Sequence, residues 1–411
     1  MIELIKAPSK LTGKVNLTAS KSISNRVLIA KYLGELKTEI INLSEAKDTL
    51  LLENILEEFK SKDTIFCENA GTTIRFLTSF LAIQKGNWKL TGSERMLKRP
   101  INDLVSSLNG IGAEISYGGN IGFPPLMIEG KKLQKNHISI SGAISSQYIS
   151  SLLLIAPCLE KGLTIEIIEP LLSKPYVEMT LEIMKEMGVE SSWDGNMISV
   201  KNQAYKSDSY TVENDWSGAS FWYSFVALSE KGSIEIPYLK SESSQGDSIL
   251  SELYTALGVE TTFRKNSISI KKNLQHSNKE FKFDLRHYPD LALPIAVTCV
   301  GLGIKCYLTG LESLKHKECD RLHCLKKELE KFNIISQVND NSILIEGSQT
   351  LKKCSSIIDT HKDHRIAMSL APLVMKINHI TFDDENVVNK SYPKFWKDME
   401  DLSFDLKRKE N

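Results

Sequence analysis

Five short segments of the sequence combine hydroxyl, amide and cationic side chains in a way that suits the binding of small anions. They are residues 20–26 (SKSISNR), 69–75 (NAGTTIR), 145–147 (SSQ) with 173–176 (SKPY), 317–321 (KECDR) and 363–365 (DHR). The planar guanidinium of arginine matches carboxylate and phosphate groups, and lysine supplies a compact charge on a flexible stem. We therefore expect the chemistry to act on a phosphorylated or carboxylated ligand.

Each of these segments also has a purely structural interpretation. Ser, Thr, Asn and Asp are the preferred N-caps of helices, so several of these side chains could serve only to start a helix. Gly71 could likewise serve only a tight turn. For any single segment, both interpretations stay open.

The elements that must position these segments repeat along the chain. Six times, a short strand leads through a polar or glycine-containing loop into a helix of small apolar residues. We predict strands near residues 15–18, 64–66, 137–140, 210–212, 281–284 and 356–358, and helices through residues 28–33, 76–81, 152–156, 221–228, 293–300 and 368–373. A helix N-terminus has free N–H groups and a partial positive charge. Two halves of three units each would therefore turn several anion-binding helix ends toward one ligand between two domains.

The composition excludes several classes of function. The chain has 411 residues, enough for two domains, and 51 basic residues balance 51 acidic ones. Without a basic excess we expect no nucleic-acid partner and no membrane surface. There is no apolar run of transmembrane length, and the N-terminus does not resemble a signal peptide. Seven cysteines without a CxxC pair fit reduced thiols, so we expect a cytoplasmic protein.

Taken together and in order, the motifs are no longer generic. The chain resembles the 5-enolpyruvylshikimate-3-phosphate synthase family of enolpyruvyl transferases from about residue 15 to about residue 396. The motifs that carry the resemblance are SKSISNR, NAGTTIR, ERMLKRPI, SSQ, LLSKPY, QGD, YPDLA, KECDR, DHRIAMS and NKSYPKFW.

The resemblance implies a transferase (3-phosphoshikimate 1-carboxyvinyltransferase) of the shikimate pathway, which makes chorismate and the aromatic amino acids. It would move the enolpyruvyl group of phosphoenolpyruvate to the 5-hydroxyl of shikimate 3-phosphate and release phosphate, through a tetrahedral intermediate. The implied fold is a two-domain inside-out α/β barrel with buried helices, each domain having three repeats of a βαβαββ-type unit. One domain would span residues 20–213, the other residues 1–19 and 214–411, with the active site in the cleft between them.

The resemblance also assigns roles to residues. Asp290 would accept the proton of the attacking hydroxyl, and Glu318 and Lys21 would handle the proton on the methylene carbon. His364 and Asn69 would support the site. Shikimate 3-phosphate would be held by Lys21, Ser22, Arg26, Ser145, Ser146, Gln147, Ser173, Tyr176, Asp290, Ser313 and Lys317. Phosphoenolpyruvate would be held by Lys21, Gly71, Arg99, Gln147, Arg321, Arg365 and Lys390.

The resemblance implies a monomer that needs no metal or organic cofactor. It also implies that glyphosate competes with phosphoenolpyruvate, since Gly71 should leave room beside that site. The sequence departs from the common family pattern in four places. Residues 18–22 read TASKS where the family commonly has PGSKS. Phe76 stands where many members have proline, Ser313 where an asparagine often binds the substrate phosphate, and Cys319 where a small or hydroxyl residue is common.

Three alternatives are consistent with parts of this pattern. Transferases that act on UDP-N-acetylglucosamine use a loop cysteine near the position of Arg99, which residues 96–99 (MLKR) lack. A protein that only binds phosphorylated metabolites would not need Asp290, Glu318 and Lys21 together. A zinc site would be built from His316, Cys319, His323 and Cys324, but Lys317 and Arg321 among them would repel a cation.

Overall fold

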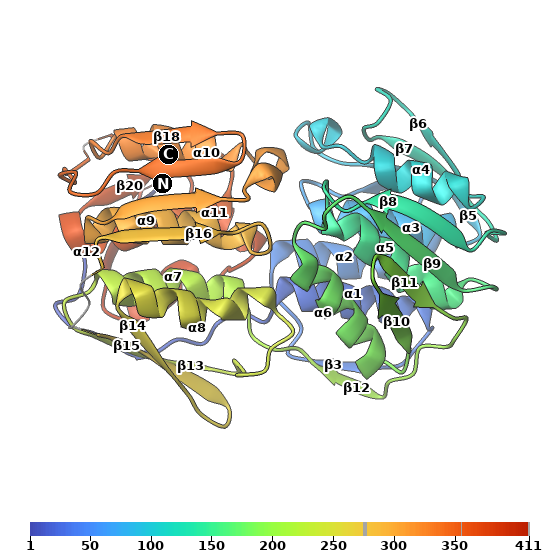
Figure 1. The fold of residues 1–411 in the computed structure, drawn as a ribbon, viewed down its shortest axis with the longest axis horizontal. Helices are drawn as coiled ribbons and strands as arrows, with labels where there is room; N and C mark the ends of the chain where they lie inside the picture. The colour runs from blue at the N-terminus through green and yellow to red at the C-terminus, as the bar shows by residue number, and fades with distance from the viewer. Residues whose placement is uncertain (274–277, 355, 410–411) are drawn as a thin grey trace. The chain divides into compact units, whose positions relative to one another are not determined.

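The computed structural model describes residues 1–273, 278–354 and 356–409, and it divides into two compact units. Unit 1 contains Met1–Ser20, Glu45–Lys47 and Glu213–Asn411, and unit 2 contains Lys21–Ser44 and Asp48–Val212. Residues 274–277, 355 and 410–411, which fall in the expected second domain, lie outside the described residues. Both ends of the described chain lie in unit 1 (Figure 1).

Two contacts within unit 1 hold the segments that lie next to the boundaries between the units. Ser20 donates its backbone N–H to Glu213 O, so both crossings of the chain are tied together. In the short segment Glu45–Lys47 of unit 1, the Glu45 carboxylate lies 2.7 Å from the ammonium group of Lys394. Both side chains are exposed, so this pair contributes little stability.

Four sheets, two in each unit, share one strand order. In three of them a strand pairs in parallel with the strand that follows the next helix; in the fourth, residues 11–14 pair in parallel with residues 232–237, with unit 2 inserted between them. An antiparallel hairpin completes each sheet. In unit 2 the orders are β4(Thr64–Phe66)-β5(Gly86–Thr91)-β7(Leu126–Gly130)-β6(Glu114–Tyr117) and β10(Ser191–Asp194)-β11(Met197–Val200)-β9(Leu163–Ile168)-β8(His137–Ser141). In unit 1 they are β14(Val259–Phe263)-β15(Ser267–Lys272)-β13(Gly232–Pro237)-β2(Leu11–Lys14) and β16(Glu280–Asp284)-β17(Lys305–Thr309)-β19(Ser342–Ile345)-β18(Ser336–Asn339).

Each unit also has one smaller sheet. In unit 2, β3 (Glu39–Ile41) pairs in parallel with β12 (Ser209–Thr211). In unit 1, β1 (Ile2–Lys6) lies between β20 (Ile380–Phe382) and β21 (Asp405–Arg408). The structure therefore has a mixed α/β fold built mainly from repeated four-stranded sheets.

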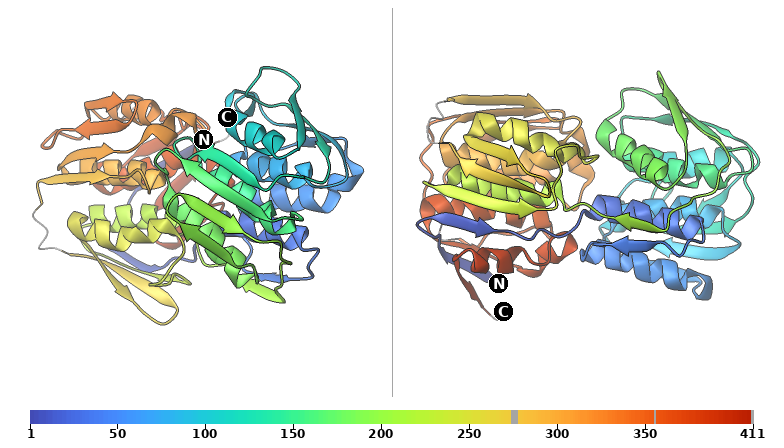
Figure 2. Two further views of the ribbon diagram at one scale, coloured as in Figure 1. Left: turned by 45° about the vertical axis from the view of Figure 1, so that its right-hand side comes forward. Right: turned by 90° about the horizontal axis from the view of Figure 1, so that it is seen from below.

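The helices between the strands form the core of each unit (Figure 1, with two further views in Figure 2). In unit 2 these are α1(Lys21–Leu33), α3(Gly71–Ala82), α4(Asn102–Gly110), α5(Ser146–Ile155) and α6(Lys174–Glu186), with α2(Lys47–Glu58) beginning at the unit boundary. In unit 1 they are α7(Trp216–Leu228), α8(Leu250–Leu253), α9(Ala292–Leu302), α10(Arg321–Glu330), α11(His364–Leu370), α12(Val374–Ile377) and α13(Phe395–Asp401). Short 3-10 turns, η1 to η9, link several of them.

Several helices are buried almost all round, which requires apolar residues on every face. In α7 only Ser217 is not buried, and α3 has one such residue, Thr72. Hydroxyl groups in these helices bond to the carbonyl one turn back, as Thr78 does to Ile74 O at 2.7 Å. The buried polar side chains are thereby satisfied without breaking the helix.

All six predicted helices are present, but two of the predicted strands are not. Residues 15–18 lie outside any strand, because β2 ends at Lys14 and the chain then turns to bond residues 213–215, with Asp215 N donating to Thr18 O. Near residues 356–358 the structure has a single bridge, between Ile358 and Phe382. None of the described helices has the length and apolarity that crossing a bilayer would take.

Candidate active site

In unit 1, Arg321 is the centre of a buried network of charges. Its guanidinium donates to three carboxylates: Nη1 to Asp290 Oδ1 at 2.9 Å, Nη2 to Glu318 Oε2 at 2.9 Å and Nε to Asp363 Oδ2 at 2.8 Å. Arg321 is the first residue of α10, and the side chain of Asp320 caps that helix. Burial alone would lower the pKa of Arg321, but Asp363, Glu318 and Asp290 raise it above its ordinary value.

Three cationic side chains surround the carboxylate of Asp290. Besides Arg321, the ammonium of Lys317 lies 3.5 Å from Oδ1 and Arg365 Nη2 lies 3.3 Å from Oδ2. Arg365 Nη1 also donates to the backbone oxygen of Asp290 at 3.1 Å. Burial alone would raise the pKa of Asp290, but Arg365, Lys317 and Arg321 hold it well below its usual range. Asp290 is therefore ionised, and its charge partly neutralises the cations around it.

Glu318 and Lys390 form the second arm of this network. Lys390 Nζ lies 3.6 Å from Glu318 Oε1, while the other carboxylate oxygen contacts Arg321. Both side chains are largely buried. We call the seven residues joined in this way the unit 1 cluster: Asp290, Lys317, Glu318, Arg321, Asp363, Arg365 and Lys390.

Sequence reasoning missed the central place of Asp363. Its side chain caps α11 by accepting from Arg365 N at 2.9 Å, and it also holds Arg321. It is fully buried, as is its neighbour His364, whose Nδ1 lies 3.5 Å from Asp363 Oδ1. The signal in the sequence was the acidic residue just before a predicted helix start, which is typical of an N-cap. Cys319, one of the departures from the family pattern, also contacts Asp363, with its sulfur 3.7 Å from Oδ2.

Asp247, the last residue of the QGD motif, is a second carboxylate, to which the sequence analysis gave no role. It is 3% exposed, accepts a hydrogen bond from the hydroxyl of Ser217, and its Oδ1 has no hydrogen-bond partner among the described residues. Burial, followed by the charge of Asp290, raises the pKa of Asp247 to about 7, although Arg365 opposes the shift. Asp247 therefore borders the unit 1 cluster as a group that titrates near neutrality.

In unit 2, the predicted residues lie at the starts of helices. Lys21 begins α1, and its ammonium lies 3.2 Å from Asp48 Oδ2. The expected ligand residues Ser145 and Ser146 lie at the start of α5, where the Ser145 hydroxyl accepts from Gln147 N. Ser173 precedes α6 with a φ of 54°, a conformation that is strained for a non-glycine residue and is often found at functional sites.

Arg26 is buried more deeply than a ligand residue is expected to be. It is 1% exposed and donates to Thr180 Oγ1 at 2.7 Å, to the backbone oxygens of Ser22 and Tyr176, and to the hydroxyl of Ser150. Its guanidinium also lies 5.3 Å from the centre of the Phe76 ring. Burial lowers the pKa of Arg26 to about 10. In this structure Arg26 ties α1, α5 and α6 together.

The space beside Gly71 is not open. A Cβ atom at this position would lie 2.6 Å from both terminal nitrogens of the Arg99 guanidinium. A side chain at position 71 would therefore displace the guanidinium, which packs against the backbone at the start of α3. The expectation that glyphosate competes with phosphoenolpyruvate beside Gly71 stays a prediction, because the contact with Arg99 describes only the space for a Cβ atom.

Three of these helices, α1, α3 and α5, pack against one another in unit 2. Lys21, Gly71 and Ser146 are the first residues of the three. Their free N–H groups add to the cations Lys21 and Arg99, so this face of the unit suits an anion. Ser313 belongs to unit 1, where it lies in the 3-10 turn Glu312–His316.

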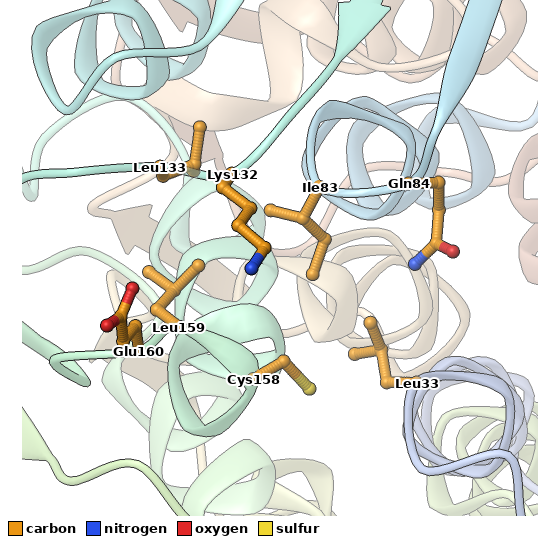
Figure 3. Close-up of a pocket in the computed structure, with 8 residues that line it drawn as sticks. All are labelled: Leu33, Ile83, Gln84, Lys132, Leu133, Cys158, Leu159 and Glu160. Carbon is orange, nitrogen blue, oxygen red and sulfur yellow. The ribbon is translucent and has the colours of Figure 1, made fainter.

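A cavity of about 320 Å³ lies at the other ends of the unit 2 helices (Figure 3). It is lined by Leu33 at the end of α1, by Ile83 just after α3, and by Cys158 beyond α5. None of the predicted site residues lines it. Helix C-termini carry partial negative charge, so this cavity does not suit an anionic ligand.

The zinc alternative finds no counterpart in the structure. Within residues 1–273, 278–354 and 356–409, no group of three or more His, Cys, Asp or Glu side chains is arranged to hold a metal ion. His323 Nδ1 instead lies 3.1 Å from Asp320 Oδ2.

Comparison with known proteins decides the family. The family model for EPSP synthase (3-phosphoshikimate 1-carboxyvinyltransferase) matches residues 5–64 and 53–399. The chain belongs to the EPSP synthase family. It is 41% identical over 409 residues to the 3-phosphoshikimate 1-carboxyvinyltransferase of Bacteroides fragilis (strain YCH46), covering 98% of both chains. It is 32% identical over 420 residues to that of Sulfurovum sp. (strain NBC37-1), covering 96% of this chain and 97% of the relative.

This chain has the same fold as solved structures of an EPSP synthase and of another enolpyruvyl transferase. The EPSP synthase of Acinetobacter baumannii superimposes with a TM-score of 0.78 at 21% identity, over 99% of both chains. The enolpyruvyl transferase NikO of Streptomyces tendae gives 0.77 at 14% identity, over 99% of this chain and 98% of the other. The sequence-based assignment to this family of transferases is confirmed.

Proposed function

We propose that this member of the EPSP synthase family transfers the enolpyruvyl group of phosphoenolpyruvate to the 5-hydroxyl of shikimate 3-phosphate and releases phosphate. The observation that carries the mechanism is the contact of one guanidinium, that of Arg321, with both Asp290 and Glu318. Addition and elimination need a base for the hydroxyl and an acid for the methylene carbon. The unit 1 cluster holds two carboxylates next to each other for these tasks.

In the addition step, Asp290 accepts the proton of the 5-hydroxyl as its oxygen attacks C2 of phosphoenolpyruvate. Glu318 and Lys21 provide the proton that the methylene carbon gains. In the elimination step a proton leaves that carbon, the double bond forms again and the C–O bond to phosphate breaks. Each proton that enters the tetrahedral adduct is thus matched by one that leaves it.

The low pKa of Asp290 has a consequence for this mechanism. Arg365, Lys317 and Arg321 depress it, and in the proposed function these cations also face the substrate anions. A bound phosphate or carboxylate adds negative charge beside them, which raises the pKa of a neighbouring carboxylate. Substrate binding therefore makes Asp290 a stronger base when the base is needed.

We further propose that residues of both units take part in this one reaction. The phosphoenolpyruvate residues would be Lys21, Gly71, Arg99, Gln147, Arg321, Arg365 and Lys390. The shikimate 3-phosphate residues would be Lys21, Ser22, Arg26, Ser145, Ser146, Gln147, Ser173, Tyr176, Asp290, Ser313 and Lys317. Arg26 would have to exchange one of its internal hydrogen bonds for a substrate oxygen, because it is buried.

The finer description of the fold belongs to the same proposal. Each unit has two full βαβαββ sheets and one smaller sheet, and we propose that the smaller sheet and its helices are a reduced third repeat. Each unit would then be an inside-out barrel, with helices within and sheets outside. We also propose a cytoplasmic monomer that uses no cofactor.

The decisive test measures phosphate release from phosphoenolpyruvate with two rival acceptors. With shikimate 3-phosphate we expect steady release, together with a product that has gained the enolpyruvyl group. With UDP-N-acetylglucosamine we expect none above background. Release only with the second acceptor, or binding of phosphoenolpyruvate without release with either acceptor, would contradict the proposal.

A further inference from the structure

Arg75 is a buried cation to which the proposed mechanism gives no task. It lies in the second turn of α3 and is 5% exposed. Its Nη1 donates to Gln147 Oε1 at 2.7 Å and to Gly71 O at 3.3 Å. Among the described residues it has no carboxylate partner, and its Nε has no hydrogen bond. A buried charge without a counter-charge is costly, so its presence calls for an explanation.

The contact with Gln147 fixes the direction of the Gln147 amide. A guanidinium can only donate hydrogen bonds, so the amide oxygen must face Arg75 and the amide nitrogen must point away. That nitrogen donates one N–H to Thr72 Oγ1 at 3.0 Å. The second N–H has no partner among the described residues, so Gln147 presents a hydrogen-bond donor and not an acceptor.

A second set of contacts leads from Arg75 to the segment that carries Arg99. The Arg75 guanidinium lies 5.5 Å from the centre of the Tyr148 ring. Burial raises the pKa of Tyr148 above its ordinary value, although the charge of Arg75 and a hydrogen bond with it oppose the shift. The Tyr148 hydroxyl donates to Pro100 O at 2.5 Å. Pro100 directly follows Arg99, whose guanidinium packs against Gly71. Arg75 is thus linked to Gly71, to Gln147 and, through Tyr148, to the Arg99 segment.

We propose that Arg75 is a positioning residue for an anionic group of phosphoenolpyruvate, which it serves by turning the Gln147 amide donor outward and by holding the Arg99 segment beside Gly71. This inference rests on the proposed function. Without Arg75 the Gln147 amide could reverse and present its oxygen, which repels a carboxylate or a phosphate. The buried positive charge of Arg75, which is costly in the free protein, is also stabilised once the anion has bound nearby.

Steady-state kinetics of Arg75→Met test this role. Methionine has a similar length and cannot donate, so we expect the KM for phosphoenolpyruvate to rise at least tenfold while the KM for shikimate 3-phosphate changes less than threefold. Thr78→Val is the matched control, because Thr78 is buried in the same helix and bonds only within it. It should lower thermal stability and leave both KM values unchanged. Equal KM values in Arg75→Met and the unmodified enzyme would overturn the proposal.

Chemical rescue separates positioning from packing. Arg75→Ala leaves a cavity of guanidinium shape, and millimolar guanidinium chloride should restore part of its affinity for phosphoenolpyruvate. Sodium chloride at the same ionic strength should not restore it. Rescue by both salts, or by neither, would mean that the arginine is only a packing element, and the proposal would fall.

A readout without turnover keeps this inference apart from the proposed function. We expect the loss of melting temperature in an Arg75→Met/Gln147→Leu double variant to be smaller than the sum of the two single losses, because both remove the same hydrogen bond. If the two losses of melting temperature simply add, Arg75 and Gln147 are not energetically coupled, and the inference is wrong. If the unmodified enzyme fails to release phosphate while the two residues are coupled, the proposed function fails and the contact stands.

Discussion

Asp290 and Arg321 form an ion pair in which the carboxylate Oδ1 lies 2.9 Å from the guanidinium Nη1, and the arginine of this pair is almost wholly buried. The pair joins the 3-10 turn Pro289–Leu291 to the first residue of α10. Because Arg321 also holds Glu318, the two groups that we assign to proton transfer cannot move independently. A substitution of Asp290 or Glu318 should therefore also alter the position of the other side chain.

The first prediction concerns Asp290→Asn. We expect kcat to fall by about 10²–10⁴, the usual contribution of a general base, while both KM values change only a few-fold. Steady-state phosphate release measures both constants. Asp320→Asn is the matched control, because asparagine caps a helix as well as aspartate does and Asp320 is more exposed. A near-normal kcat in Asp290→Asn would remove Asp290 from the role of base.

The second prediction concerns Glu318→Gln. Glutamine keeps the size of the side chain and one oxygen for Arg321, but it cannot give up a proton to carbon. We expect the methylene hydrogens of phosphoenolpyruvate to exchange with deuterated water at least about 10²-fold more slowly than in the unmodified enzyme. Proton NMR or mass spectrometry of recovered phosphoenolpyruvate follows this exchange. Exchange at the unmodified rate would show that another group handles that proton.

The third prediction concerns Gly71→Ala. The added methyl group would meet the Arg99 guanidinium at 2.6 Å, so the guanidinium must move. We expect the KM for phosphoenolpyruvate to rise about tenfold, which corresponds to about 1.4 kcal/mol. Gly110→Ala is the matched control, since Gly110 ends α4 and nothing lies within 4 Å of its added Cβ. An unchanged KM in Gly71→Ala would show that the place of Arg99 beside the backbone does not matter for binding.

The fourth prediction concerns the pH dependence of stability and Asp247. Its pKa is about 7 in the folded protein and near 3.9 in an unfolded chain. Between these values the folded state binds the additional proton, so this residue's contribution to stability falls as the pH rises and is lost above about pH 7. Asp247→Asn removes this loss. The free energy of unfolding of the variant, relative to the unmodified protein, should rise from pH 4 to pH 8 by on the order of 1–4 kcal/mol.

Urea unfolding at several pH values measures this difference. The comparison between the two proteins matters, because Asp290 has a lowered pKa and makes the opposite contribution, which is lost as the pH falls. A difference that stays constant over the range would show that Asp247 does not titrate there. A difference that shrinks would contradict the sign of the shift.

Local features of the site could be predicted from the sequence because they depend on neighbouring residues. The start of α5 follows from a serine N-cap, and the structure has Ser145 in that position. The start of α3 has no such signal, because its N-cap is Ala70, which has no capping side chain. The family roles of Asp290, Glu318 and Arg321 came from the resemblance, since no spacing rule places Arg321 against Asp290, 31 residues away. The strand expected at residues 15–18 was wrong because bonding to residues 213–215 overrides local preference there.

Long-range pairings of buried polar groups could not be predicted. Arg75 and Gln147 are 72 residues apart, and Asp363 meets Arg321 across 42 residues. Each such contact depends on which helix starts the fold brings together, and the sequence does not give those distances. Asp247 was missed for the same reason, because its raised pKa comes from burial and from the charge of Asp290, not from its sequence neighbours.

The place of β1 within its sheet has a consequence for how the protein forms during synthesis. Ile2 pairs with Phe382 on one side and with Arg408 on the other, so β1 cannot complete its sheet until residues 380–408 have left the ribosome. Unit 2 ends at Val212 and can assemble earlier. Until those residues have been made, both edges of β1 remain unpaired, and a chaperone that shields such edges would protect the nascent chain from aggregation.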